Sequence, residues 1–200
     1  MSAPASAPPR ATRDRLIDAA VQVVARQGLE AASVKAVAAQ AGVTAGLLHY
    51  HFADKDELMV AALRRALEAY QARLRERRAE RSSAEQLPGL IADARAATDT
   101  DADVFRLRLA FASRALSHPD LAPVIRELNA AGVEETAATL AAAAGRAEPN
   151  EVDRRVGATL KAAFDGIMLA WLNDPAFPFD AAAELLAEGA QVVLDLPPPA

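Results

Sequence analysis

The side chains best suited to chemistry or to binding are concentrated in one stretch, VTAGLLHYHFADKDEL, which runs from Val43 to Leu58. It holds two of the chain's three histidines and one of its two tyrosines, followed by a lysine between two aspartates. These residue types allow three kinds of chemistry: coordination of a metal ion, acid–base catalysis, or binding to another macromolecule. Their spacing helps to choose among the three.

The spacing of His49 and His51 argues against a metal site. Residues two apart lie about 200° apart around a helix, so the two imidazoles cannot share one ion. The chain contains no cysteine, and no third histidine lies nearby in the sequence. A lone imidazole could still act as an acid or base, or simply face solvent, although a surface turn offers no pocket that excludes water.

Two short predicted helices position this stretch. Ser33 and Thr44 are residue types that cap helix N-termini, and Gly42 suits the end of the first helix because glycine tolerates a left-handed backbone. The first helix is therefore expected to follow Ser33 and to end at Gly42, and the second to run from Thr44 to His51. This is the layout of a helix-turn-helix motif.

The second of these helices is expected to have one buried and one exposed side. Leu48 and Phe52 share one side and should point into a small core. The outward side carries small and polar residues, namely Ala45, Gly46, His49 and Tyr50. Two small residues beside an imidazole and a phenol suit close approach to a DNA groove. DNA contact is therefore the favoured role of the stretch.

The rest of the chain is also predicted to be helical. Of its 200 residues 52% are apolar but only 4% are aromatic, which favours close packing of alanine-rich helices. A helix is expected from Lys55 into the charged run RLRERRAERSS, and others near 12–27, 85–97, 101–117, 121–145, 150–173 and 179–194. Prolines predict a disordered arm at 1–9 and a tail at 196–200. No strand pattern is found, so the expected fold class is all-α.

Charge is distributed unevenly along the chain. Residues 1–81 contain 13 Arg and Lys against 9 Asp and Glu, a net charge of +4, whereas residues 82–200 contain 9 against 18, a net charge of −9. A basic first part and an acidic second part suggest two separate roles, unless the asymmetry is a chance property of solvated faces. No signal segment and no apolar run of membrane length is found, so a cytoplasmic protein is expected.

The run from Thr12 to Leu63 resembles the DNA-binding domain of TetR-family transcriptional regulators. The family pattern has an amphipathic first helix, a G-x-x-x-x-S/T start to the second helix, an A-G-V turn and a block G-x-L-Y-x-H/Y-F-x-x-K-x-x-L. This sequence matches it at Gly28, Ser33, Ala41, Gly42, Val43, Gly46, Leu48, Tyr50, His51, Phe52, Lys55 and Leu58. It departs from the pattern at His49, where the family usually has tyrosine, and this departure bears on which base is recognised.

The resemblance implies an N-terminal three-helix helix-turn-helix DNA-binding domain at 10–56. A larger helical effector-binding and dimerisation domain would follow at 57–195. The resemblance also implies base-edge contacts from Lys35, Ala45, Gly46, Leu47 and His49, and phosphate contacts from Ser33, Thr44, Tyr50, His51 and Lys55. Further arginines could add phosphate contacts or form an ordinary solvated helix start: Arg10, Arg13 and Arg15.

A DNA-binding domain this small covers only a few base pairs, so a symmetric dimer is expected. Apolar stripes of the last two helices are the candidate interface, unless they form the protomer's own core: Val156, Leu160, Ala163, Ile167, Trp171, Leu185, Leu186, Gly189, Val192 and Val193. The middle helices would hold an effector pocket. Its candidate residues, each of which could instead be a core or surface residue, are Phe105, Arg108, Leu109, Phe111, Phe164, Asp165 and Met168.

Together these features predict a ligand-responsive transcriptional regulator. It would act as a repressor that binds a palindromic operator as a homodimer and is released by an unknown small-molecule effector. No catalytic residue, metal or cofactor is expected, since the sequence lacks G-x-S-x-G, H-E-x-x-H, P-loop and dinucleotide-binding fingerprints. Two alternatives stay open: a protein-interaction module built on a helix-turn-helix-like domain, and a small helical enzyme.

Overall fold

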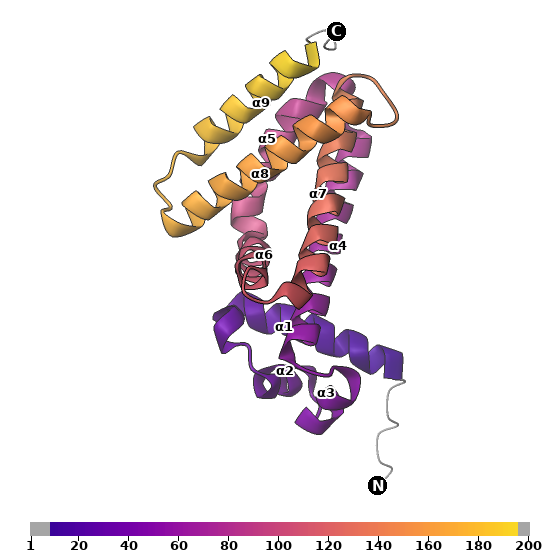
Figure 1. The fold of residues 1–200 in the computed structure, drawn as a ribbon, viewed down its shortest axis with the longest axis vertical. Coiled ribbons are helices and arrows are strands. Elements are labelled where there is room, and N and C mark those ends of the chain that lie inside the picture. Colours follow the sequence, from indigo (N-terminus) through magenta and orange to yellow (C-terminus); the bar gives the residue numbers. More distant parts are fainter. Residues whose placement is uncertain (1–8, 196–200) are drawn as a thin grey trace. The chain divides into compact units, whose positions relative to one another are not determined.

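The computed structural model describes residues 9–195, and these residues form helices and connecting turns. This part of the chain has nine α-helices, two short 3-10 helices and no strand, which confirms the all-α prediction (Figure 1). The arm predicted at 1–9 and the tail at 196–200 lie outside the described residues, apart from Pro9, where the first helix begins. Of the described helices, none is long and apolar enough to cross a membrane.

The helix bounds agree with the sequence prediction to within a few residues. The elements are, in chain order, α1 (Pro9–Ala31), α2 (Val34–Ala41), α3 (Ala45–His51), α4 (Lys55–Glu80), η1 (Ser83–Glu85), α5 (Gln86–Thr100), α6 (Ala102–Ala115), η2 (Pro119–Leu121), α7 (Ala122–Ala143), α8 (Glu151–Asn173) and α9 (Phe179–Asp195). Gly28, the predicted stop of the first helix, interrupts α1 with φ 79° and ψ 166°. The 3-10 helices η1 and η2 have no counterpart in the prediction.

The chain divides into two compact units, the first ending at Glu68 and the second beginning at Ala69. The boundary falls within α4, which therefore contributes one part of its length to each unit. Compactness alone assigns no function, so the functional domains at 10–56 and 57–195 remain a prediction.

The first unit is closed by apolar packing and by an ion-pair link between α4 and α1. Leu48 and Phe52 are buried, as their helical positions predicted, together with Leu16, Val37, Leu58, Met59 and Leu63. Arg65 of α4 reaches α1, where its Nη2 lies 2.7 Å from Asp14 Oδ1 and its Nη1 lies 2.7 Å from Asp18 Oδ1. These contacts fix the first turns of α4 to the small helical core.

In the second unit α8 packs against both α7 and α9, and α8 and α9 run side by side (Figure 1). The approach of α8 to α7 depends on Gly157, because a Cβ built there would lie 3.1 Å from Ala137 N. Two apolar clusters of described residues lie in the core of this unit. One is formed by Ala94, Ala97, Phe105, Met168, Phe179 and Ala183, and the other by Leu87, Leu140, Leu160 and Ala190.

The start of α8 contains a fully buried carboxylate, that of Asp153. Burial alone would raise the pKa of Asp153, but hydrogen bonds from Arg146 and from the Asn150 backbone N–H outweigh it, so this pKa lies below its usual value. The Asn150 side chain in turn accepts from the Asp153 N–H at 3.0 Å, which completes a capping box.

Candidate nucleic-acid interface

The turn between α2 and α3 is fixed by backbone hydrogen bonds. Gly42 adopts φ 65° and ψ 37°, in the left-handed region that disfavours other residues. Its N–H donates to Ala39 O at 3.1 Å, and the Val43 N–H donates to Ala38 O at 2.9 Å. This pair of bonds is a Schellman motif, which ends α2 and sets the direction in which the chain enters α3.

Side-chain caps fix the first turns of both helices. Ser33 Oγ accepts from the Ala36 N–H at 3.1 Å, and Thr44 Oγ1 accepts from the Leu47 N–H at 3.2 Å. Both caps were predicted from the sequence. Each satisfies one backbone N–H that a helix start leaves without a partner. The short α3 is thereby held in a defined position on the unit.

The outer surface of this unit contains the residues that were predicted to contact DNA. Those exposed are Ser33, Lys35, Thr44, Ala45, Gly46, Leu47, His49 and Tyr50, while His51 and Lys55 are half-buried. Tyr50 is 76% exposed and meets the ring of His51 edge-on at 5.1 Å between centroids. The phenol of Tyr50 is therefore free to contact a ligand from solvent, as a donor or as an acceptor.

This surface offers hydrogen-bond donors and small residues rather than a reaction centre. The unit exposes hydroxyl, imidazole and ammonium groups, and Ala45 and Gly46 are exposed and small, so a ligand's edge can approach the backbone of α3 closely. Among the described residues no group of three or more His, Cys, Asp or Glu is placed to hold a metal ion. The arrangement is chemically suited to binding phosphate groups and base edges.

Two arginines of α1 have roles in the fold that sequence reasoning missed. The Arg13 guanidinium lies over the Phe52 ring, 4.9 Å from its centroid, and Arg15 Nη2 donates to Ala41 O at 2.5 Å. Arg15 thus supports the end of α2 directly beside the Gly42 turn. Nothing in the local sequence signals these contacts, because each joins residues 26 or more positions apart.

The effector candidates lie inside the second unit. Phe105, Arg108, Phe111 and Met168 are buried, and Leu109, Phe164 and Asp165 are half-buried. Aromatic rings meet edge-to-face in the series Tyr70, Phe105, Phe164, Phe179 and Trp171. Aromatic packing of this kind stabilises the core, and it also provides surfaces for a flat ligand.

A cluster of charged and polar side chains includes two of the effector candidates, Arg108 and Asp165. Arg108 pairs with Asp165, and Lys161 Nζ lies 2.8 Å from Asp165 Oδ2 and 3.2 Å from Asn129 Oδ1. Burial, together with repulsion from Arg108, lowers the pKa of Lys161, although Asp165 opposes the shift. Lys161 was not predicted, but its spacing of four residues from Asp165 on one helix was a usable signal.

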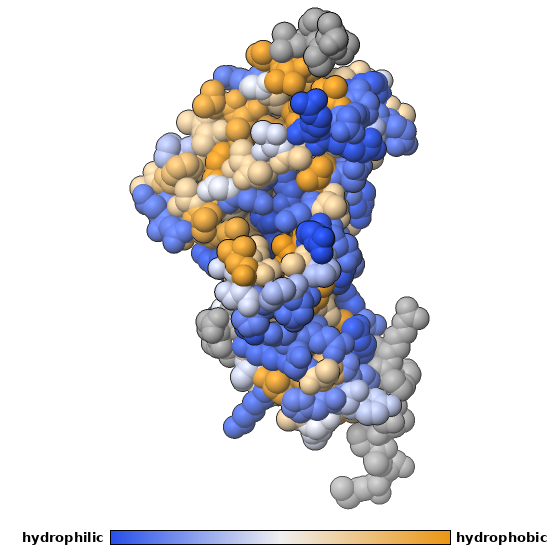
Figure 2. Space-filling view, in the orientation of Figure 1, coloured by the Kyte–Doolittle hydropathy of each residue, from blue (hydrophilic) through white to orange (hydrophobic). Residues whose placement is uncertain are grey.

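The dimer candidates separate into two groups. Some pack against the protomer's own clusters, because their side of α8 or α9 faces the other helices of the unit: Val156, Leu160, Ile167, Trp171 and Leu186. Ala163 is half-buried, whereas Leu185, Gly189, Val192 and Val193 are exposed. Figure 2 shows apolar residues gathered over α8 and α9, where Leu169 and Leu185 are 48% and 68% exposed.

A small helical unit with a capped helix-turn-helix and an exposed second helix defines a helix-turn-helix DNA-binding protein. Residues 16–62 match the model for "Bacterial regulatory proteins, tetR family", and residues 83–195 match that for "BetI-type transcriptional repressor, C-terminal". The "HTH-type transcriptional regulator BetI" of Paraburkholderia phytofirmans is 32% identical over 177 residues, which cover 86% of this chain and 87% of that protein. The chain belongs to the TetR family of bacterial transcriptional regulators, as the sequence resemblance indicated.

Solved structures agree with this assignment. The multidrug binding protein EbrR complexed with imidazole is 35% identical, with a TM-score of 0.65, and the match covers 94% of this chain and 96% of that one. A transcriptional regulator from Rhodococcus is 29% identical, with a TM-score of 0.72, covering 93% and 99%. Members of this family regulate transcription, so the alternative of a helical enzyme is not supported.

Proposed function

We propose that this protein is a homodimeric repressor that binds a palindromic operator and is released from it by a small-molecule effector. The observation that carries the proposal is the exposed face of α3, where Ala45, Gly46, His49 and Tyr50 face outward from a helix fixed by the Thr44 cap. Its small residues would let the helix enter the major groove. Its N-terminal part would then meet base edges, while Lys55 and Tyr50 would contact phosphates.

The homodimer would form through α8 and α9. Leu169, Leu185, Val192 and Val193 give these helices an exposed apolar surface, which a monomer in water would leave uncovered. Pairing of the same two helices from a second protomer would bury it around a two-fold axis. That symmetry would match a palindromic operator, with half-sites about 34–36 Å apart or a multiple of that distance.

The effector would bind among the aromatic residues of the second unit. EbrR, one of the similar proteins, has been solved complexed with ethidium, at 32% identity and a TM-score of 0.68. A small aromatic molecule would pack against rings such as Phe105 and Phe164, and its polar groups would meet Arg108 or Asp165. This assignment keeps the effector residues predicted from the sequence.

Release from DNA would be a shift between two populations of the dimer. The helix α4 begins in the first unit and ends in the second, so a change around its C-terminal part would be transmitted along it to the DNA-binding unit. To convert almost all of the population, an effector must bind the released state more favourably than the DNA-binding state by about 5.5 kcal/mol.

The proposal is tested by selecting binding sites for the full-length protein from random double-stranded DNA at low salt. An enriched palindrome with half-sites about one turn apart would support a dimeric, sequence-specific regulator. If no sequence is enriched, even when small aromatic compounds are added, the operator part of the proposal fails. A protein partner retained by a variant with its α3 face altered would then favour the protein-interaction alternative.

A further inference from the structure

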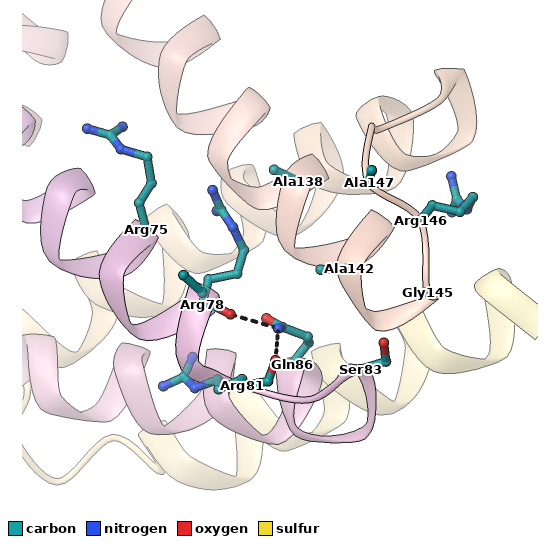
Figure 3. A pocket seen from close by; sticks show the side chains of 11 residues that line it. Arg75, Arg78, Arg81, Ser83, Gln86, Ala138, Ala142, Gly145, Arg146 and Ala147 are labelled. Carbon is teal, nitrogen blue, oxygen red and sulfur yellow. Dashed lines mark hydrogen bonds between the residues drawn. The ribbon is translucent and has the colours of Figure 1, made fainter.

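A cavity of about 510 Å³ lies in the second unit between the C-terminal part of α4, η1 and α7 (Figure 3). Its described lining residues include no aspartate or glutamate but four arginines, Arg75, Arg78, Arg81 and Arg146. The sequence from Ala69 onward contains 14 Arg and Lys against 20 Asp and Glu, a net charge of −6. A basic cavity in so acidic a unit is therefore a local feature and not the general background.

Two of these arginines are fully engaged elsewhere. Arg81 makes a bidentate pair with Asp93, at 2.8 Å and 2.9 Å. Arg146 makes a bidentate pair with the buried Asp153, and Figure 3 shows its side chain pointing away from the other lining side chains. Arg77 Nε also lies 3.2 Å from Asp93 Oδ1, but both oxygens of Asp93 accept from Arg81, so the Arg81 guanidinium is held in place by two parallel hydrogen bonds.

The other two arginines share a single carboxylate. Arg75 pairs with Glu135 Oε1, and Arg78 Nη1 lies 3.1 Å from Glu135 Oε2. Figure 3 shows the Arg78 side chain rising from α4 toward α7, and its Nη1 also donates to Glu135 O at 3.1 Å. One carboxylate between two guanidiniums leaves one surplus positive charge at the cavity wall. Since the Arg78 side chain is only 18% exposed, water screens this charge incompletely.

Polar groups also line the base of the cavity, beside η1. Gln86 lies between Arg78 and Ser83, and its Nε2 donates to the backbone oxygens of Arg78 and Arg81 at 3.0 Å and 3.1 Å (Figure 3). Its Oε1 is buried and has no hydrogen-bond partner, a rare condition for a buried acceptor. The Ser83 hydroxyl is exposed on the same side. Of these groups the Ser83 hydroxyl can donate a hydrogen bond to an anion, whereas Gln86 Oε1 can only accept one.

We propose that this cavity binds a small anion with at least two negative charges, of the phosphate or carboxylate class. Arg75 and Arg78 would hold it, in competition with Glu135. The Glu135 pairs join α4 to α7, so the anion would weaken that link when it binds. The site is separate from the aromatic residues assigned to the effector. The anion site itself does not depend on the proposed function. Only an effect of the bound anion on DNA affinity rests on it, because that effect would be transmitted along α4.

The test is isothermal titration calorimetry of the full-length protein with pyrophosphate, and separately with citrate, at low ionic strength. We expect one anion bound per chain, and the two probes distinguish phosphate from carboxylate preference. Arg78→Gln should weaken binding about tenfold or more, since a charge-assisted hydrogen bond is lost. Glu135→Gln should tighten binding, because it removes the competing carboxylate. A misfolded variant could not produce this opposite effect.

Arg154→Gln is the matched control, because Arg154 also pairs with an α7 glutamate, Glu134, but does not line the cavity. Its anion affinity should equal that of the parent protein. The site is refuted if the parent binds neither probe at millimolar concentration, or if Arg78→Gln and Arg154→Gln bind equally well. It is also refuted if Glu135→Gln binds more weakly than the parent. These results do not depend on DNA, so a failed operator selection leaves the anion site to be judged by calorimetry alone.

Discussion

Replacing Gly46 by alanine should separate the stability of the first unit from its binding to DNA. Gly46 is exposed in the first turn of α3, and a Cβ built on it would approach nothing closer than Thr44 Oγ1, at 4.0 Å. The fold therefore has room for the added methyl group. Alanine stabilises a helix interior over glycine by about 0.5–1 kcal/mol, and in a first turn we expect the lower end, about 0.5 kcal/mol.

The same methyl group would stand on the face that we propose meets base edges. Holding α3 off the groove should cost about 1 kcal/mol at each half-site, the lower end of the range for one mismatched base pair. A homodimer has two half-sites, so the loss should be about 2 kcal/mol. This corresponds to a roughly 30-fold rise in Kd.

The assay combines urea unfolding with fluorescence anisotropy on the selected operator at one fixed salt concentration. Ser113→Ala is the control, since Ser113 is an exposed residue of α6 that belongs neither to the α3 face nor to the proposed α8 and α9 dimer surface, and alanine is a better helix former than serine. It should raise stability by a similar amount and leave the Kd for DNA unchanged.

Two outcomes would refute this reasoning. If Gly46→Ala raises stability but leaves the Kd unchanged, then Gly46 does not face DNA and α3 is not the recognition helix. If stability falls together with affinity, then the glycine is required by the fold, and the 4.0 Å clearance from Thr44 has been misjudged.

Three further predictions concern phosphate contacts, helix packing and pH. Tyr50→Ala combined with Lys55→Ala should weaken specific and non-specific DNA binding alike, and should lower the slope of log Kd against log salt by about 2, one lysine–phosphate contact per half-site. Competition titrations over a salt series measure both. Gly157→Ala should reduce the free energy of unfolding in urea by about 1–3 kcal/mol, because the new Cβ would lie 3.1 Å from Ala137 N. Asp153→Asn should be less stable than the parent at pH 7. The pKa of Asp153 is depressed in the folded state, so its carboxylate stabilises the fold above the unfolded pKa of about 3.9, and this stabilisation is lost as pH falls through the folded pKa. The difference in urea midpoint between the parent and the variant should therefore shrink below about pH 4.

The sequence by itself determined the helices and the motif, because the signals that define them act over a few residues. Ser33 and Thr44 begin helices by bonding backbone N–H groups three residues ahead, and Gly42 ends one by adopting a left-handed conformation. Helical spacing likewise placed Leu48 and Phe52 inside. The outward face of α3 follows directly from these constraints.

Only the tertiary structure decided which partner each remaining side chain has. Periodicity marks Leu160 and Leu185 alike as apolar positions, yet Leu160 is buried in the protomer and Leu185 is 68% exposed. The hydrogen bond that Arg15 donates to the Ala41 carbonyl could not be predicted from the sequence either, because the two residues are 26 positions apart. The spacing of apolar residues predicts which side of a helix is apolar. What that side contacts depends on how distant segments pack. That packing is a property of the folded chain as a whole.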